Sequence, residues 1–233
     1  MTRVLVVREE AAARDTARQL SALGRDPVSC PLEEVVRLRT PVPQTTFDGF
    51  VVTSAQAAEA LADAFPNDNR ICFAVGEATA NAVRACGFEN VAAGDGRAET
   101  LPRLVESAFG HALPGATLLY AAGRNRTGAL EAAVTGTSIA LRAWEVYDIV
   151  RRTPPDREID ALFQGDAIGA VLLLSKAQAM AFADILLPRF EALQPPPRLL
   201  CLSARIAEAF PARARELIKI SDAPSLVSLF ERL

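Results

Sequence analysis

Small hydroxyl residues follow two apolar runs of this 233-residue chain in nearly the same phrase. Thr53 and Ser54 follow FVV and open SAQAAEAL, and Ser175 and Lys176 follow VLLL and open SKAQAMAF. A hydroxyl at the start of a helix caps the first backbone N–H groups, and such N-termini favour negative charge. The repeated phrase therefore predicts two places where an anionic ligand could bind.

Cations and a glycine turn follow other apolar runs. Arg8 follows RVLVV, Gly76 and Thr79 lie in the turn after ICFAV, and Arg124 follows TLLYAAG. Guanidinium groups, hydroxyls and backbone N–H groups all suit carboxylates. We expect these residues to bind an anion together, although each of them alone could equally be ordinary solvated surface.

The aromatic residue that could do chemistry is Tyr147, in the extended segment WEVYDIV. A phenol carries both an acidic proton and a hydrogen-bonding oxygen. The alternative is a half-buried tyrosine of a strand whose hydroxyl is merely satisfied.

The sequence lacks the residues that several other kinds of chemistry require. GRNRTGAL has Ala129 and Leu130 where a phosphate-binding loop needs lysine and a hydroxyl, and neither G-x-G-x-x-G nor G-x-S-x-G follows a strand. His111 is the single histidine and lies in a loop-like segment. The four cysteines have no metal spacing, and we expect them to be structural: Cys30, Cys72, Cys86 and Cys201. We predict that the protein uses no metal or organic cofactor.

Charge and hydropathy exclude two classes of partner. The net charge is −3 and the pI about 5.4, so no global basic field attracts nucleic acid or anionic membrane. No apolar stretch approaches the roughly 20 residues of a membrane helix, and the opening MTRVLVVREE is too short for a signal peptide's apolar core. We expect a cytoplasmic monomer.

Apolar runs of strand length alternate with Ala-rich segments of helix length. Such runs are typical of parallel strands that are buried on both faces, so the sequence predicts an α/β fold. The expected strands are residues 3–7, 50–53, 71–75, 117–121, 170–174 and 198–202.

The chain contains an internal repeat in a permuted order. FVVTSAQAAEAL and then RICFAVGEATANAV match VLLLSKAQAMAF and then RLLCLSARIAEAF, whereas TLLYAAGRNR matches the opening RVLVVREE. This order predicts two similar parallel-sheet, flavodoxin-like domains, one inserted in the other and joined by a two-stranded hinge. The expected boundaries are residues 1–33 plus 151–233 for domain 1, 39–143 for domain 2, and 34–38 and 144–150 for the linker strands.

This organisation suggests where a ligand would bind. Ligands of such sheets bind beyond the carboxyl ends of the strands, where the candidate residues fall in both repeats. We expect the two matching edges to line one cleft. The alternative is a duplicated fold that was kept only for packing.

The ordered motifs resemble the uroporphyrinogen-III synthase family over almost the whole chain. The motifs are VREE, FDGFVVTSAQAAEAL, AVGEATANAVRACGFENV, AETLPRLV, TLLYAAGRNR, EVYDI and LLLSKAQAM. The resemblance implies cyclisation of linear hydroxymethylbilane to uroporphyrinogen III, with inversion of the last pyrrole ring, loss of water and no cofactor. It also implies a substrate with acetate and propionate groups on every ring.

The resemblance carries over to single residues. Tyr147 matches the family's tyrosine on the return crossing, which would protonate the departing hydroxyl. Positions that match the family's binding hydroxyls and glycine are Thr53, Ser54, Gly76, Thr79 and Ser175. The second turn departs from the pattern, because Ser203 replaces glycine and Ile206 replaces threonine.

Two other functions remain open from the sequence. A bilobed α/β protein could bind or sense a small molecule without catalysis. A degenerate synthase paralogue could act only through protein contacts.

Overall fold

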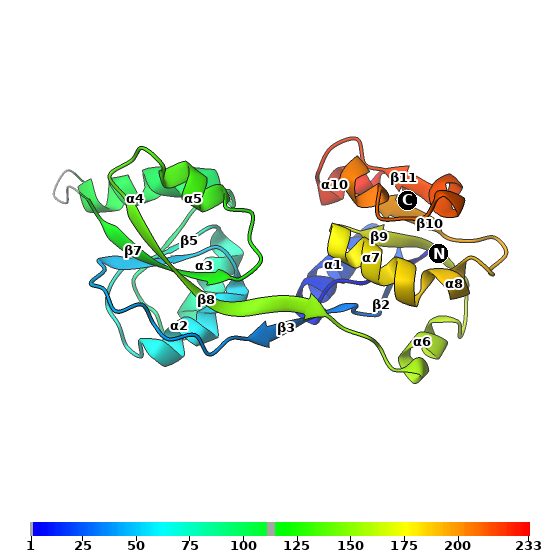
Figure 1. The fold of residues 1–233 in the computed structure, drawn as a ribbon, viewed down its shortest axis with the longest axis horizontal. Coiled ribbons are helices and arrows are strands. Elements are labelled where there is room, and N and C mark those ends of the chain that lie inside the picture. Colours follow the sequence, from blue (N-terminus) through cyan, green and yellow to red (C-terminus); the bar gives the residue numbers. More distant parts are fainter. Residues whose placement is uncertain (1, 111–114) are drawn as a thin grey trace. The chain divides into compact units, whose positions relative to one another are not determined.

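The chain folds into two compact units. The computed structural model describes residues 2–110 and 115–233, so His111 lies outside the described residues. Unit 1 comprises Met1–Glu34 and Val150–Leu233, and unit 2 comprises Val35–Ile149. Each unit has a sheet with helices on both faces (Figure 1).

Unit 1 contains a five-stranded parallel sheet in the order β2–β1–β9–β10–β11. Its strands are β1 (Arg3–Val6), β2 (Asp26–Ser29), β9 (Ile168–Leu173), β10 (Arg198–Cys201) and β11 (Ile218–Ile220). Its helices are α1 (Glu10–Ala22), α6 (Asp156–Leu162), α7 (Lys176–Ile185), α8 (Leu187–Phe190), α9 (Ala204–Ala207), the 3-10 helix η4 (Ala212–Leu217) and α10 (Leu226–Phe230). Helices α1 and α10 pack on one face of the sheet, and α6 to α9 pack on the other.

Unit 2 contains a six-stranded sheet in the order β3–β8–β7–β4–β5–β6. Its strands are β3 (Glu33–Arg37), β4 (Gly49–Val52), β5 (Cys72–Ala74), β6 (Val91–Ala93), β7 (Thr117–Gly123) and β8 (Ala140–Arg151). Its helices are η1 (Ala55–Ala57), α2 (Ala58–Ala64), α3 (Glu77–Ala85), η2 (Ala98–Thr100), α4 (Leu101–Phe109) and α5 (Ala129–Val134). Helices α2 and α3 cover one face, and α4 and α5 cover the other.

The predicted α/β class is confirmed, with two parallel-rich sheets. The central strands β1, β4, β9 and β10 are almost wholly buried because helices cover both faces of each sheet. The expected strand list omitted β2, β6 and β11. These strands have 4, 3 and 3 residues and lie at sheet edges, where polar residues and Pro27 are tolerated.

Strand order gives the permuted repeat its structural counterpart. In unit 1, numbered in chain order, the five strands lie in the order 2-1-3-4-5, which is the flavodoxin-like arrangement. Unit 2 has the same spatial order, β8–β7–β4–β5–β6, when β7 is placed opposite β1. Apart from β3, the chain therefore builds the third, fourth and fifth strands of this arrangement first, as β4, β5 and β6, and the first and second strands last, as β7 and β8.

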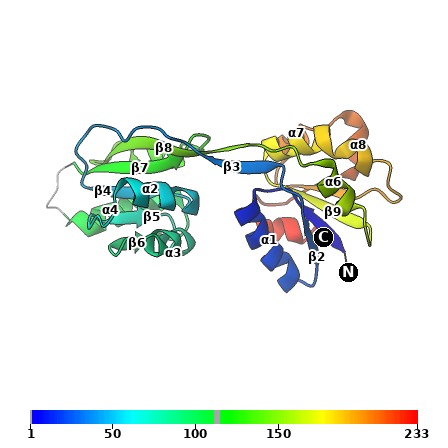
Figure 2. The same cartoon turned by 90° about the horizontal axis from the view of Figure 1, so that it is seen from below.

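The two segments that pass between the units pair with each other. The amide of Leu38 donates to the carbonyl of Val146 at 2.8 Å, and the amide of Arg152 donates to the carbonyl of Leu32, also at 2.8 Å. Because the residue numbers run in opposite directions, β3 and β8 are antiparallel, and they lie side by side in Figure 2. The indole Nε1 of Trp144 donates to the carbonyl of Thr40 at 2.9 Å, which fixes the segment after β3.

The cysteines are free thiols, and burial of three of them suppresses their reactivity. Burial raises the pKa of Cys30 to about 11 and those of Cys72 and Cys201 to about 12, so they remain protonated at neutral pH.

None of the helices in residues 2–110 and 115–233 is long and apolar enough to cross a membrane.

An arginine holds the aromatic part of the unit 2 core together. The guanidinium carbon of Arg70 lies 4.2 Å from the ring centre of Phe47 and 4.8 Å from that of Phe50. The same group donates to Asp68 and to the carbonyl of Phe47. Hydrogen bonds from Arg70 hold the pKa of the Asp68 carboxyl below its usual range. Stacking on the aromatic rings and donating two hydrogen bonds to one carboxylate both require the planar guanidinium group of an arginine.

We predict that Arg70→Lys destabilises unit 2 by about 1–2 kcal/mol at pH 7, because the ammonium keeps the charge but loses the stacked fork. Urea unfolding followed by Trp144 fluorescence measures this, since Trp144 is the single tryptophan and packs in unit 2. The depressed Asp68 pKa contributes stability above the usual carboxyl pKa of about 4, so the difference should shrink as the pH falls below that value.

Arg103→Lys is the matched control. Arg103 is exposed on α4 of the same unit and should leave the midpoint unchanged. Equal unfolding midpoints for Arg70→Lys and Arg103→Lys would show that the contacts of the Arg70 guanidinium contribute nothing measurable to the stability of unit 2.

Candidate functional site

Each sheet has one point where the strand order reverses. The reversal lies between β1 and β9 in unit 1 and between β7 and β4 in unit 2. At such a point the loops after the two neighbouring strands run in opposite directions, which creates room for a ligand between them. The residues beyond the carboxyl ends of these strands are therefore the candidate site in each unit.

Tyr147 reaches the carboxyl end of β7 through a break in strand register. Ala122 pairs with Glu145, but Gly123 pairs with Tyr147, so Val146 is an extra residue in β8. Such bulges re-aim side chains at sheet rims. A Cβ on Gly123 would lie 2.8 Å from Cζ and 2.9 Å from the hydroxyl oxygen of Tyr147, so the tyrosine ring occupies the space that glycine leaves.

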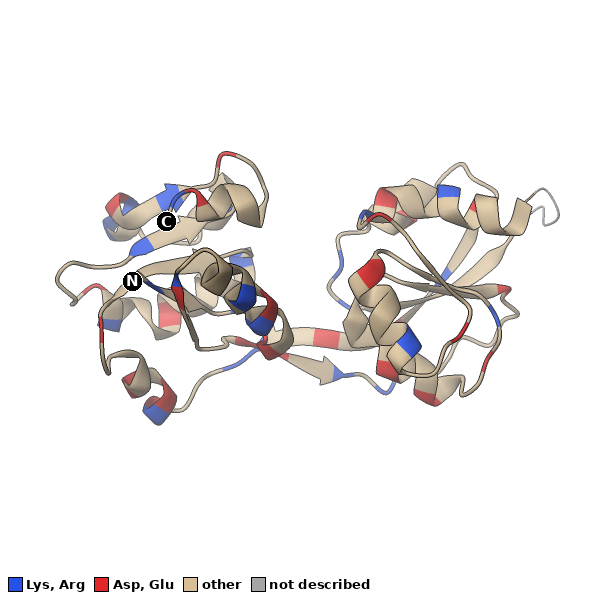
Figure 3. Cartoon of the chain, turned by 180° about the vertical axis from the view of Figure 1, so that it is seen from behind, with Lys and Arg blue, Asp and Glu red and all other residues tan. Residues whose placement is uncertain are grey.

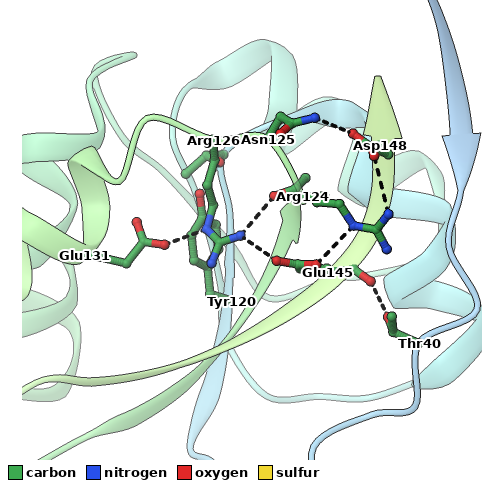
Figure 4. Close-up of polar contacts among 10 residues, drawn as sticks. Thr40, Tyr120, Arg124, Asn125, Arg126, Glu131, Glu145 and Asp148 are labelled. Atoms are coloured by element: carbon green, nitrogen blue, oxygen red, sulfur yellow. Dashed lines mark hydrogen bonds and ion pairs between the residues drawn. The ribbon is translucent and has the colours of Figure 1, made fainter. Parts of the chain in front are cut away.

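Two arginines of the loop after β7 are held by carboxylates (Figure 4). Nε of Arg124 lies 3.4 Å from Oε2 of Glu145, and its Nη1 lies 3.5 Å from Oδ2 of Asp148. Nη1 of Arg126 donates to Oε1 of Glu145 at 3.2 Å, and its Nε lies 2.5 Å from Oε1 of Glu131. Glu145 thus lies between both cations, and three carboxylates face two guanidinium groups.

The two arginines differ in freedom. Hydrogen bonds and charge from Glu131 and Glu145 raise the pKa of Arg126, whose side chain is 25% exposed. Arg124 is 51% exposed and is held at longer distances. Arg124 can therefore exchange a protein carboxylate for a ligand carboxylate more readily than Arg126 can.

Asp148 and its neighbour Asn125 close the cluster. Asp148 is 8% exposed, and its Oδ1 accepts from Nδ2 of Asn125 and from the amide of Ile149, each at 2.8 Å. A buried carboxylate needs such donors. The loop after β7 is thereby tied to β8.

Thr53 lies at the same edge, after β4. Its Oγ1 is 2.8 Å from the hydroxyl of Tyr120, a residue of β7 that is 3% exposed. Burial raises the pKa of Tyr120, as do the charge of Glu131 and the neighbouring Tyr147, so the phenol stays protonated. Thr53 itself is half-buried.

The other candidates of unit 2 have local roles. Oγ of Ser54 accepts from the amide of Gln56 at 3.3 Å and so starts η1. A Cβ on Gly76 would come within 3.1 Å of Gly96, so glycine allows close backbone approach there. Thr79 is 7% exposed on α3 and adds little surface.

At the unit 1 edge, a carboxylate occupies the start of α1. Glu9 accepts from the amides of Ala11 and Ala12, each at 2.9 Å. Nη1 of Arg8 donates to Oγ1 of Thr16 at 3.1 Å. The first amides of α1 are thus already used, and Arg8 lies against the helix that follows it.

The Ser175 hydroxyl also has protein partners. It accepts from the amide of Gln178 at 3.1 Å and lies 3.4 Å from Oε1 of Glu33. Gln178 is buried and donates to Glu33 at 2.8 Å, while its Oε1 accepts from the amide of Leu174 at 2.9 Å. Burial raises the pKa of Glu33. Lys176 is exposed next to this cluster.

The departures at Ser203 and Ile206 have a simple structural outcome. Ser203 starts α9 without a side-chain cap, and Ile206 is 6% exposed within the unit 1 core. The lost hydroxyl is replaced by apolar packing.

The structure brings some predicted residues together and adds others. Thr53, Arg124 and Tyr147 share one edge in unit 2, and Arg8, Ser175 and Lys176 share one in unit 1. The polar partners of these residues were not predicted from the sequence: Tyr120, Glu145, Asp148, Glu33 and Gln178. The Ser-x-x-Gln spacing of 175 and 178 is a capping-box pattern that could have found the last of them.

The charge distribution suits local rather than long-range recognition. Acidic and basic positions are interspersed along both units (Figure 3). Within the described residues, no three His, Cys, Asp or Glu side chains lie close enough to hold a metal ion. The chemistry available at the unit 2 edge is proton donation by a phenol and carboxylate binding by hydroxyls and guanidinium groups.

A solved structure with low sequence identity shares this fold. Uroporphyrinogen-III synthetase from Helicobacter pylori 26695 is 19% identical to this chain, with 100% of this chain and 98% of that chain covered and a TM-score of 0.61. A mutant uroporphyrinogen III synthase from Thermus thermophilus is 20% identical over 100% and 97% of the two chains, with a TM-score of 0.47. No curated protein matches the sequence significantly.

A family model covers nearly all of the chain. The model of uroporphyrinogen-III synthase HemD matches residues 14–231. This match includes both candidate edges apart from Arg8 and Glu9. The chain therefore belongs to the uroporphyrinogen-III synthase HemD family.

Proposed function

We propose that this chain is an active uroporphyrinogen-III synthase, which converts hydroxymethylbilane to uroporphyrinogen III and water. Family membership over residues 14–231 supports the reaction class. The observation that carries the proposal is the register break that sets Tyr147 over Gly123, beside the arginine cluster.

Tyr147 acts as the general acid in this proposal. Its phenol protonates the hydroxyl of the substrate's hydroxymethyl group, the C–O bond breaks, and water leaves. The azafulvenium cation that remains is attacked by the already substituted carbon of the last ring, which gives a spiro intermediate. The bond from that carbon to the methylene bridge of the preceding ring then breaks, the bridge bonds to the free α-carbon of the last ring so that the ring is inverted, and that carbon gives its proton back to the phenolate.

The anion-binding residues hold the acetate and propionate groups. Arg124 exchanges Glu145 or Asp148 for a substrate carboxylate, whereas Arg126 stays in its protein contacts. The other proposed binding residues are Arg8, Thr53, Ser54, Gly76, Thr79, Ser175 and Lys176. Holding the two ends of the linear substrate in one geometry favours ring inversion over direct closure. Most of the catalysis therefore comes from positioning the substrate.

We predict that the wild-type protein yields more type III product than spontaneous closure does and that Tyr147→Phe lowers kcat about 100-fold, since general acids contribute roughly that much. The measurement incubates purified protein with fresh hydroxymethylbilane and resolves the oxidised uroporphyrin isomers.

Tyr147→Phe keeps the ring atoms that lie over Gly123, so its unfolding midpoint should equal that of the wild type. Type I product alone from folded wild-type protein would exclude the synthase. Full activity of Tyr147→Phe would exclude the phenol as the acid.

We predict that Gly123→Ala lowers kcat at least about tenfold, because a methyl group would lie 2.8–2.9 Å from three Tyr147 atoms and must displace the ring. The same isomer assay measures this effect. In a Tyr147→Ala background the added methyl group has space, so it should change kcat no further. An equal loss in both backgrounds would mean that Gly123 does not act through Tyr147.

A further inference from the structure

We propose that Tyr120 is a positioning residue that orients the Thr53 hydroxyl as a hydrogen-bond donor toward a substrate carboxylate. The inference rests on the proposed function and deepens it by naming what makes one of the binding groups selective for an anion.

Tyr120 belongs to the core, and only its hydroxyl reaches the edge of the sheet. The residue lies on β7 and is 3% exposed, with its ring packed in the cluster that contains Val51, Leu101 and Leu130. The Arg126 guanidinium carbon lies 5.8 Å from the ring centre. The ring is therefore fixed, and its hydroxyl cannot move to find another partner.

The hydrogen bond to Thr53 has a direction that follows from this burial. Within the described residues, Oγ1 of Thr53 is the one hydrogen-bonding partner found for the Tyr120 hydroxyl, at 2.8 Å. A buried O–H group without an acceptor is unfavourable, so the phenol donates and Thr53 accepts. The phenol is also the more acidic of the two hydroxyls and remains protonated.

Thr53 is then left with one proton and no protein acceptor among the described residues. Because Thr53 is half-buried at the carboxyl end of β4, that proton is available to a group outside the sheet. A threonine hydroxyl can rotate to donate or to accept, but one that already accepts from a fixed phenol binds best as a donor. Its preferred partner is an acceptor such as a carboxylate.

The test is a double-mutant cycle on substrate binding. Tyr120→Phe removes one oxygen and should raise KM about fivefold with kcat unchanged within about twofold, which is the size of a typical hydrogen bond. In a Thr53→Val background, Tyr120→Phe should change KM no further. Thr53→Ser keeps the hydroxyl and should restore the sensitivity to Tyr120→Phe.

Thr137→Val is the matched control, because Thr137 also has a hydrogen-bonded hydroxyl in unit 2 but precedes β8 at the opposite edge. It should leave KM unchanged, and Trp144 fluorescence should show a cooperative unfolding transition for every variant, which establishes that each one is folded at the assay temperature. An unchanged KM in Tyr120→Phe, or an equal rise in both Thr53 backgrounds, would overturn the inference.

A second readout separates this inference from the synthase itself. Binding of uroporphyrin III, followed by quenching of Trp144 fluorescence, measures Kd for the same variants without turnover. The Tyr120 and Thr53 substitutions could have coupled effects on Kd although the wild-type protein forms no type III product. That result would support the role of Tyr120 and exclude the synthase. A protein that neither converts the bilane nor binds uroporphyrin III would overturn both.

Discussion

The parallel pairing of β7 with β4 on one side and β8 on the other is the constraint on which the unit 2 site depends. Buried strands must satisfy their backbone hydrogen bonds with neighbours, and parallel pairing sends all three carboxyl ends to one edge. Thr53, Arg124 and Tyr147 come from three separate segments and meet only there. The extra residue in β8 then turns the phenol onto the one position of β7 that has no side chain.

Electrostatics at this edge is local and nearly balanced. Glu145 lies between Arg124 and Arg126, so the cations do not create a strong positive field. In the proposed function, carboxylates of the substrate compete with those of the protein, which favours a ligand that presents several anionic groups at once. In the proposed function, a chain with net charge −3 binds its polyanionic substrate through these local contacts rather than through a global positive field.

Much of the fold follows from patterns that a single sequence displays. FVVT, AVLLL and RLLCL are continuous apolar runs because both faces of a central parallel strand are buried. The repeat retains the strand order because each copy must build the same sheet. Short edge strands lack this signal: β11 has a lysine at its centre, and the three apolar residues of β6 are too few to stand out as a strand.

Local patterns suffice for the α/β class, the permuted repeat, and hydroxyls and cations at the ends of strands, because burial and helix capping act on neighbouring residues. The partners of those groups depend instead on how distant segments pack. Tyr120 meets Thr53 across 67 positions, and Glu33 meets Gln178 across 145. Such contacts depend on sheet register and on one inserted residue in β8, and neither leaves a local pattern in the sequence.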